Sequence, residues 1–172
     1  MAKKSIILVG PMGVGKSTIG RMLADLVKLP FEDTDQLIES RTGADIPWIF
    51  DVEGEEGFRQ RESAALNDLL KGDPGVVATG GGIVLKPENR SNLILSGTVI
   101  YLTAAIDQLV ARTSKDKKRP LLQVADPEAK IRELILQRDP LYREVADKII
   151  ATDRRGPRSV AQEIARFYEG ES

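Results

Sequence analysis

The sequence predicts an α/β fold of three layers, in which a central five-stranded parallel sheet is covered by helices on both faces. Short apolar segments alternate along the chain with longer stretches of helical periodicity, which is typical of β-α units. The apolar segments consist largely of β-branched and other apolar residues, as strands buried on both faces require. At 172 residues, with 41% hydrophobic and 30% charged residues, the chain fits a single domain over residues 1–172. It contains no internal repeat and no low-complexity linker.

The predicted elements follow one another in a regular order. Strands are expected over residues 5–9, 31–33, 75–79, 98–102 and 148–151. The first helix follows the first strand, because apolar residues recur there at helical spacing, at Ile19, Met22, Leu23, Leu26 and Val27. Further helices are expected over residues 55–70, 87–95, 106–113, 128–138 and 159–168.

The turn between the first strand and the first helix carries the sequence Gly-Pro-Met-Gly-Val-Gly-Lys-Ser-Thr over residues 10–18, which matches the spacing G-x-x-x-x-G-K-[ST]. Glycines let successive backbone N–H groups surround an anion at the positive end of the helix dipole. Lys16 can then reach the β- and γ-phosphates, and the Ser17 hydroxyl can ligate the Mg²⁺ that bridges them. The alternative is a glycine-rich turn that arose by chance, and the flanking strand and helix argue against it. The motif therefore predicts binding of a nucleoside triphosphate.

The composition excludes several kinds of chemistry. The absence of cysteine excludes disulfides and thiolate chemistry, and the absence of histidine leaves a carboxylate, lysine, tyrosine or water as general base. A formal net charge of −1 argues against a surface that coats nucleic acid. The basic residues 1–4 precede only five apolar residues, too few for a signal peptide or a membrane span. We therefore expect a cytoplasmic chain with no nucleic-acid or membrane partner.

Two carboxylates, Asp33 and Asp35, follow the second predicted strand. Ligands of open α/β sheets gather at the carboxyl ends of the strands, so both side chains are expected to face the phosphate loop. One could hold Mg²⁺ through water, and the other could orient an acceptor hydroxyl and take its proton. An aspartate in this position could instead serve as an N-cap for the residues that follow. The presence of the phosphate loop favours the functional interpretation.

Three consecutive glycines, Gly80, Gly81 and Gly82, follow the third predicted strand. Glycine allows the backbone to approach a ligand or a neighbouring element closely, although a flexible turn would have the same composition. Their place at the carboxyl end of a central strand favours a role facing the substrate.

Two arginines and one basic segment are ambiguous on pattern alone. Arg59 could form a surface ion pair with Glu62 on the same helix face, and the spacing alone favours that interpretation. Arg138 could be a cation near the C-terminus of the helix predicted over residues 128–138. The polar, basic residues 113–120 show no periodicity, and a long loop of this kind is either functional or disordered. A mobile basic loop also suits an arginine that closes over phosphates.

In this order, the motifs strongly resemble the shikimate kinase family of P-loop NTPases, which are similar to nucleoside monophosphate kinases. The resemblance runs from about Lys4 to Tyr168, and besides the phosphate loop it includes residues 33–35, 41–43, 53–55, 58–59, 80–82, 119–122 and 138–142. It implies transfer of the γ-phosphoryl of ATP to the 3-hydroxyl of shikimate, on the route to chorismate and the aromatic amino acids. It further implies Mg²⁺, a monomer, a shikimate-binding region over residues 33–62 and a mobile lid over residues 113–126.

The resemblance also implies a role for individual residues. It makes Lys16, Asp35 and Arg119 catalytic, with Arg119 carried by the lid. It places ATP against Gly13, Val14, Gly15, Lys16, Ser17, Thr18, Arg112, Arg119 and Arg155. It places shikimate against Asp35, Arg59, Gly80, Gly81, Gly82 and Arg138, with Phe50 and Phe58 as apolar walls. It assigns Ser17 and Asp33 to Mg²⁺.

Two alternatives remain beside this interpretation. Another small-molecule P-loop kinase, acting on a sugar acid, would also need arginines that bind an anion. A nucleotide-binding module without turnover would share the phosphate loop. Such a module would have no need of Asp35 and Arg119 in register with Lys16 and Ser17.

Overall fold

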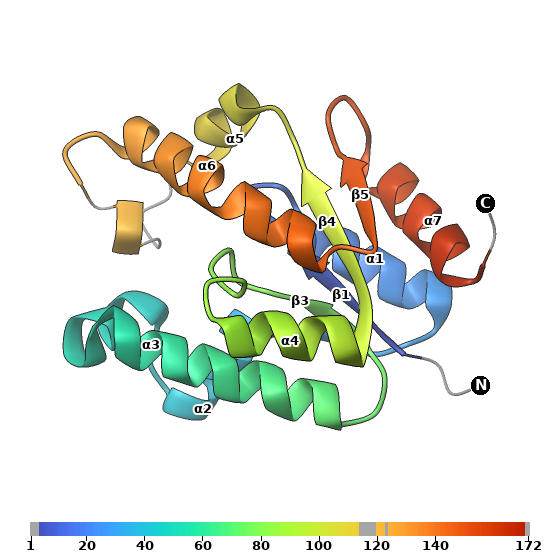
Figure 1. The fold of residues 1–172 in the computed structure, drawn as a ribbon, viewed down its shortest axis with the longest axis horizontal. Helices are drawn as coiled ribbons and strands as arrows, with labels where there is room; N and C mark the ends of the chain where they lie inside the picture. Colours follow the sequence, from blue (N-terminus) through green and yellow to red (C-terminus); the bar gives the residue numbers. More distant parts are fainter. Residues whose placement is uncertain (1–3, 114–119, 123, 171–172) are drawn as a thin grey trace.

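Five parallel strands form the central sheet in the order β2-β3-β1-β4-β5 (Figure 1). The structure, a computed structural model, describes residues 4–113, 120–122 and 124–170. The strands are β1 (Ser5–Val9), β2 (Phe31–Asp33), β3 (Val76–Ala78), β4 (Gly97–Thr103) and β5 (Lys148–Ala151). All four strand pairings are parallel, which confirms the predicted fold class.

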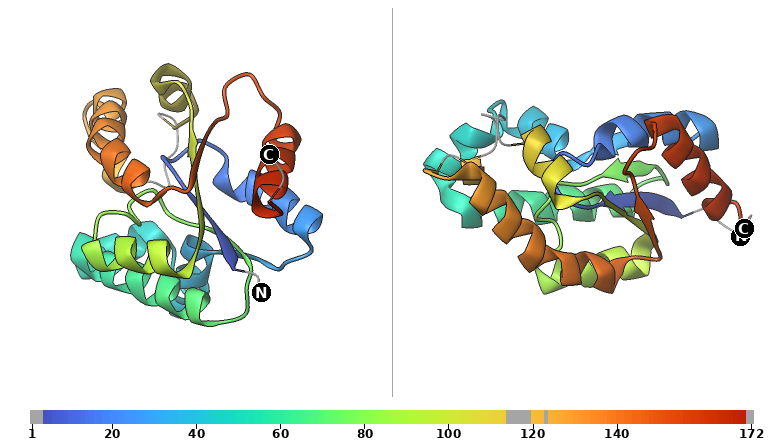
Figure 2. Two further views of the ribbon diagram at one scale, coloured as in Figure 1. Left: turned by 45° about the vertical axis from the view of Figure 1, so that its right-hand side comes forward. Right: turned by 90° about the horizontal axis from the view of Figure 1, so that it is seen from above.

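Helices cover the sheet on both faces, as two further views show (Figure 2). They are α1 (Lys16–Val27), α2 (Thr34–Thr42), α3 (Ile46–Lys71), α4 (Pro87–Ser96), α5 (Ile106–Thr113), α6 (Pro127–Val145) and α7 (Pro157–Tyr168), with a 3₁₀ turn over Pro120–Leu122. Helices α1 and α7 lie side by side on one face, and α4 and α6 lie on the other (Figure 2). Within the described residues, no helix is both long and apolar enough to cross a membrane.

Alternate residues of β1 explain why this strand is apolar throughout. Ile6 and Leu8 pack into the core that contains the buried faces of α1 and α7. Ile7 and Val9 point the other way, into the core formed with α3, α4 and α6. All four side chains are fully buried, as expected for a central strand covered on both sides.

The region between β2 and β3 contains more helix than the sequence predicted. Helix α2 was not predicted, because it is short and has no continuous apolar stripe; its buried residues are Thr34 and Ile38. Helix α3 spans Ile46–Lys71 but is divided at Gly54, where φ is +74°; the segment after Gly54 is the helix predicted from residue 55, and the segment from Ile46 to Gly54 was not predicted. The positive φ at Gly54 disrupts the helical periodicity on which the prediction depended.

Helix α6 is longer than predicted, and this corrects the interpretation of Arg138. We expected this residue near a helix C-terminus, but α6 continues through Pro140 to Val145. Proline removes one backbone N–H from the helix, which favours an end there. Burial of Tyr142 and Val145 beyond it stabilises the continued helix, because tertiary packing of an apolar face outweighs local propensity.

The segment predicted as a lid, residues 113–126, is described only in part. Its described portions include Thr113 at the end of α5, the turn Pro120–Leu122 and the cap residue Asp126 of α6. Leu122 is buried against Val110 of α5 and against α6. Arg119 lies outside the described residues, so its role stays a prediction.

Candidate active site

The phosphate loop lies between β1 and α1 and depends on glycine at specific positions. Gly10 and Gly13 both have positive φ, +147° and +84°. A Cβ at Gly10 would collide with the carbonyl oxygen of Leu102, and one at Gly13 would collide with the Thr113 side chain. The loop is therefore pressed against the end of β4 and against α5, in a conformation that L side chains rarely adopt.

Lys16 is the first residue of α1, and its side chain folds back over the loop. Its ammonium group donates hydrogen bonds to the carbonyl oxygens of Gly10, at 2.5 Å, and Pro11, at 2.9 Å. The ammonium group and the N-terminus of α1 place positive charge at the same point. Such a site binds an anion, and phosphate groups are the anions that loops of this geometry bind.

Asp33 joins the phosphate loop to α2. Its Oδ2 accepts a hydrogen bond of 2.7 Å from the Ser17 hydroxyl, and its Oδ1 accepts from the backbone N–H groups of Asp35 and Gln36. The same side chain is therefore both the N-cap of α2 and a neighbour of the phosphate loop. The two interpretations of the sequence were not exclusive.

The oxygens of Ser17 and Asp33 fit a magnesium ion. Hydroxyl and carboxylate oxygens are the ligands that Mg²⁺ prefers, and this ion keeps several waters when it also binds substrate phosphates. Within residues 4–113, 120–122 and 124–170, no group of three or more acidic side chains could hold a metal by itself. A site of few protein oxygens beside a phosphate loop suits an ion that arrives with a nucleotide.

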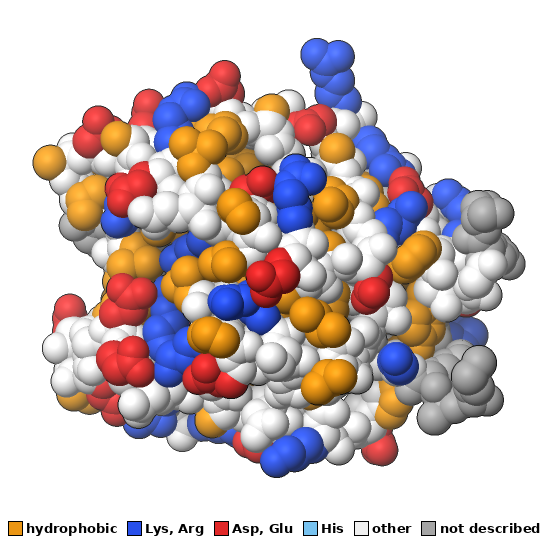
Figure 3. Space-filling model, viewed as in Figure 1, with side chains coloured by type: hydrophobic (Ala, Val, Ile, Leu, Met, Phe, Trp, Pro, Cys, Tyr) orange, Lys and Arg blue, Asp and Glu red, His pale blue; other side chains and the backbone are white. Residues whose placement is uncertain are grey.

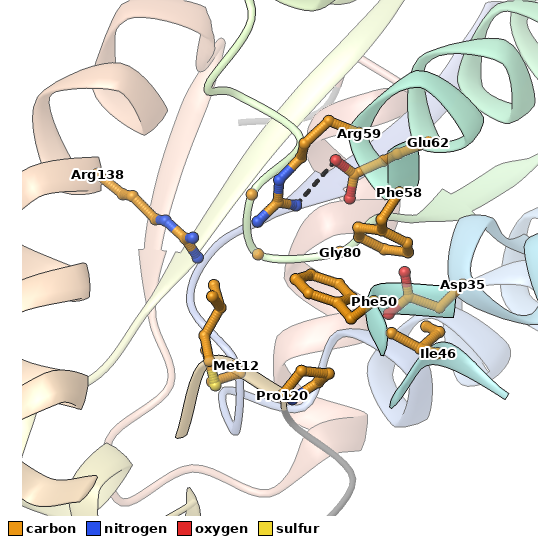
Figure 4. A pocket seen from close by; sticks show the side chains of 13 residues that line it. Met12, Asp35, Ile46, Phe50, Phe58, Arg59, Glu62, Gly80, Pro120 and Arg138 are labelled. Atoms are coloured by element: carbon orange, nitrogen blue, oxygen red, sulfur yellow. Dashed lines mark hydrogen bonds and ion pairs between the residues drawn. The ribbon is translucent and has the colours of Figure 1, made fainter. Parts of the chain in front are cut away.

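The phosphate loop lines one cavity, the phosphate cavity, together with Asp33 and Thr79. A second cavity, called the acceptor cavity below, adjoins it and is lined by both charged and apolar side chains (Figure 4). It lies between α3, the turn Pro120–Leu122 and α6, where the surface is indented at the left edge of Figure 3. Phe50 and Phe58 form an apolar wall, with ring centroids 4.9 Å apart. Met12, Asp35, Gly80 and Gly81 line both cavities, so the two sites meet at these residues.

Arg59 and Arg138 reach this cavity from different helices, and their guanidinium groups point toward each other across it (Figure 4). Both side chains are buried, with 7% and 4% of their surface exposed. Arg59 forms the ion pair with Glu62 that the spacing suggested, at 3.0 Å, but the pair is buried and not on the surface. Burial lowers the pKa of Arg138, so this guanidinium lacks the solvation that normally favours its charged form.

Glu62 is a residue of the site that the sequence analysis did not identify as such. Its Oε1 binds Arg59, whereas its buried Oε2 has no hydrogen-bond partner among the described residues. Burial raises the pKa of Glu62; Arg59 opposes the shift, and the negative charge of Asp35 adds to it. Its position three residues after Arg59 was visible in the sequence, but its complete burial was not.

Each glycine of the turn after β3 leaves room for a different charged group. A Cβ at Gly80 would lie 2.9 Å from carboxylate oxygens of both Asp35 and Glu62. A Cβ at Gly81 would lie 3.3 Å from Arg138 Nη1, and one at Gly82 would lie 2.6 Å from Arg59 Cζ. The acidic and arginine side chains of the cavity therefore pack closely against the backbone of this turn, and a side chain at any of its three positions would displace one of them.

The remaining predicted nucleotide residues differ in their surroundings. Arg112 donates a hydrogen bond of 3.1 Å to the carbonyl of Gly13 and so lies over the phosphate loop. Thr18 lines the phosphate cavity, whereas Val14 is buried in the core. The Arg155 guanidinium binds Glu163, at 2.7 Å, and Ser159, and none of these three residues lines the phosphate cavity.

Comparisons with known proteins agree on one family. A family model described as shikimate kinase matches residues 12–169. The shikimate kinase of Pseudomonas syringae pv. tomato is 58% identical over 167 residues, which cover 96% of this chain and 97% of that protein. The shikimate kinase of Chromohalobacter salexigens is 55% identical over 162 residues, covering 94% and 90%.

Solved structures give the same result. The shikimate kinase of Acinetobacter baumannii, solved in complex with shikimate, has a TM-score of 0.94 and 49% identity, covering 98% of this chain and 94% of that one. A gluconokinase of Sinorhizobium meliloti, with a TM-score of 0.58 and 16% identity, shares only the fold.

Proposed function

Because the chain belongs to the shikimate kinase family, we propose that its two adjoining cavities hold ATP and shikimate. The chain is an ATP-dependent phosphotransferase that converts shikimate to shikimate 3-phosphate and ADP. In this reaction a bond forms between the acceptor oxygen and the γ-phosphorus, and the bond to the β–γ bridging oxygen breaks. The hydroxyl proton leaves the acceptor, and ADP is the leaving group.

The phosphate loop binds the triphosphate of ATP. Backbone N–H groups over residues 13–18 surround the phosphates, and Lys16 exchanges its contacts with the loop carbonyls for phosphate oxygens. Ser17 and Asp33 hold Mg²⁺, Ser17 as a ligand and Asp33 behind it. When bound, Mg²⁺ neutralises charge on the phosphates. Arg112 supports the loop from α5, and Arg155 is assigned to the adenine end only by resemblance to the family.

Asp35 orients the acceptor hydroxyl and takes its proton. It lines both cavities, so a hydroxyl placed beside it faces the phosphate loop. Phosphoryl transfer proceeds through a loose transition state, in which the acceptor proton leaves late and a strong base is not required. A carboxylate in this position therefore acts mainly by orientation. This placement of Asp35 is the single observation that carries the proposed mechanism.

Arg59 and Arg138 bind the carboxylate of shikimate. Arg59 is already paired with Glu55 and Glu62, whereas the buried Arg138 forms no ion pair among the described residues, so a substrate carboxylate would give Arg138 an anionic partner. The planar guanidinium matches the two oxygens of a carboxylate. Glu62 Oε2, which has no hydrogen-bond partner among the described residues, offers a hydrogen-bonding group to a hydroxyl of the same substrate.

Arg119 stabilises the charge of the transferring phosphoryl group. Pro120 and Leu121, the next residues in the chain, line the acceptor cavity, which supports this assignment. Closure of a lid over residues 113–126 would exclude water and so prevent hydrolysis of ATP. We further propose that the chain works as a cytoplasmic monomer of one domain. Acidic and basic side chains are interspersed on the face in Figure 3, which suits small-molecule substrates better than nucleic acid.

The test is a coupled assay of ADP release from Mg·ATP, with and without shikimate, using gluconate as the control acceptor. Wild-type turnover that depends on shikimate, and that is lost in Asp35→Asn, supports both the substrate and the site. ADP release indifferent to shikimate would overturn the substrate assignment. Absence of any turnover, with ATP still raising the melting temperature, would indicate a nucleotide-binding module.

A further inference from the structure

Tyr142 lies behind the acceptor cavity and has no part in the mechanism above. It is fully buried on α6, and its hydroxyl donates a hydrogen bond of 2.5 Å to the carbonyl oxygen of Gly81. Arg138, one helical turn earlier, approaches the same glycine: a Cβ at Gly81 would lie 3.3 Å from Arg138 Nη1 and 3.7 Å from the Tyr142 hydroxyl oxygen. Tyr142 does not line the acceptor cavity, so any effect on the substrate passes through these two partners.

The chemistry of these groups determines how the hydroxyl is used. A carbonyl can only accept, so the Tyr142 proton goes to Gly81, and this leaves the lone pairs of its oxygen available to the neighbouring Arg138 guanidinium, which can only donate. Burial raises the pKa of Tyr142 to about 12, so the hydroxyl keeps its proton at neutral pH. Phenylalanine has the same ring and lacks the hydroxyl.

We propose that Tyr142 is a positioning residue for shikimate, because its hydroxyl holds the Arg138 guanidinium and the Gly81 peptide in a fixed relation. Arg138 Nη1 lies 3.3 Å from where a Cβ of Gly81 would be, so the two partners meet at the cavity wall. Glycine is the residue with the most backbone freedom, and a long arginine side chain has many rotamers. Anchoring both before the substrate arrives lowers the entropy lost on binding.

Tyr101 provides a matched control. Its ring stacks on that of Tyr142, with centroids 4.9 Å apart, and it is equally buried. Its hydroxyl, however, donates to Asp139 Oδ1, at 2.6 Å, and Tyr101 does not line either substrate cavity. Tyr101→Phe therefore removes the same atom from the same aromatic pair without releasing Arg138 or Gly81.

The experiment measures kcat, both KM values and melting temperature for Tyr142→Phe and Tyr101→Phe. This inference rests on the proposed function, so wild-type turnover with shikimate is established first. We expect Tyr142→Phe to raise the KM for shikimate roughly tenfold, as the loss of one buried hydrogen bond can, and to leave the KM for Mg·ATP within about twofold. Tyr101→Phe should leave both KM values within about twofold.

Equal effects of the two variants on shikimate KM, or a parallel loss of Mg·ATP affinity in Tyr142→Phe, would overturn the proposal. A double-mutant cycle gives a second, independent readout. If Tyr142 acts through Arg138, Tyr142→Phe should have less than about a threefold effect on shikimate KM in an Arg138→Ala background. Effects that simply multiply would show that the hydroxyl does not act through Arg138.

Discussion

Ser17 at the start of α1 and Asp33 at the end of β2 are joined by a hydrogen bond of 2.7 Å between Ser17 Oγ and Asp33 Oδ2. The second oxygen of Asp33 caps α2, the helix that begins the acceptor side of the site. One carboxylate therefore connects Ser17, the proposed metal ligand at the end of the phosphate loop, with the helix that carries Asp35. Substitutions of Asp33 should therefore change two measurable quantities, the Mg²⁺ requirement of the reaction and the free energy of unfolding.

Substitution of Asp33 can distinguish these two effects. Asparagine is as good an N-cap as aspartate, so Asp33→Asn should leave the free energy of unfolding nearly unchanged. Loss of the negative charge should raise the Mg²⁺ concentration for half-maximal activity roughly tenfold or more, as for other groups behind a metal ligand. Asp33→Ala should show the same Mg²⁺ effect and lose about 1 kcal/mol of stability as well. Activity against Mg²⁺ concentration and urea unfolding provide the two measurements. An unchanged Mg²⁺ requirement in both variants would show that Asp33 serves only as the N-cap of α2 and has no role in metal binding.

Arg138→Ala should weaken shikimate binding specifically. Loss of a guanidinium that pairs with a carboxylate should raise the KM for shikimate roughly ten- to hundredfold, with little change in the KM for Mg·ATP. Arg132→Ala on the same helix is the control, because Arg132 is exposed and pairs with Asp107 on the surface. Steady-state kinetics and the shikimate-induced rise in melting temperature measure both variants. A fall in ATP affinity instead would refute the assignment of Arg138 to the carboxylate.

Gly82→Ala should disturb the acceptor side through Arg59. The added methyl group would occupy the space of the guanidinium, 2.6 Å from Cζ, and force it to move. Displacement of a positioned group by about 1 Å can cost roughly a hundredfold, so we expect the KM for shikimate to rise ten- to hundredfold. Gly156→Ala is the control, because a Cβ there meets nothing within 4 Å. Kinetics of the two variants measure the difference, and similar KM values would mean that Arg59 has room to adapt.

Local patterns made the nucleotide side of the site predictable. The phosphate loop, the strand before it and the helix after it occupy consecutive residues, and their chemistry follows from composition and spacing. Asp33 was predictable for the same reason, since residues at the carboxyl ends of parallel strands come together in this fold.

The acceptor side depends on tertiary packing, which the sequence alone does not reveal. Arg59 and Glu62 have the spacing of an ordinary surface pair, and only the packing of α3 buries them. Arg138 seemed to lie near a helix end because Pro140 follows, whereas burial of Tyr142 carries the helix onward. Resemblance to the family supplied the proposed roles of both arginines, but it gave no role to Glu62 or to Tyr142, although Tyr142 belongs to the motif over residues 138–142.

Glu62 should make the free energy of unfolding decrease as pH rises, and the Glu62→Gln variant should lack this contribution. The pKa of Glu62 is raised in the folded state, mainly by burial, from an ordinary value of 4.5. The folded protein therefore keeps a proton that the unfolded chain has already lost. The contribution of Glu62 is fully favourable below pH 4.5 and declines as pH rises through the folded pKa. Glutamine cannot titrate, so the free energy of unfolding of wild type minus that of Glu62→Gln should fall across this window. Urea unfolding of both proteins between about pH 4 and 8 measures this difference.

Glu53→Gln is the control of opposite sign. Glu53 is exposed on α3, and its hydrogen bond from Arg61 lowers its pKa below 4.5. Its contribution is therefore present above pH 4.5 and is lost as pH falls through the folded pKa. The difference between wild type and Glu53→Gln should be flat across the window in which the Glu62 difference falls. If the Glu62 difference is also flat above pH 4.5, the carboxyl is ionised in the folded protein. Pairing with Arg59 would then outweigh burial, and the cavity would hold an additional negative charge near the substrate carboxylate.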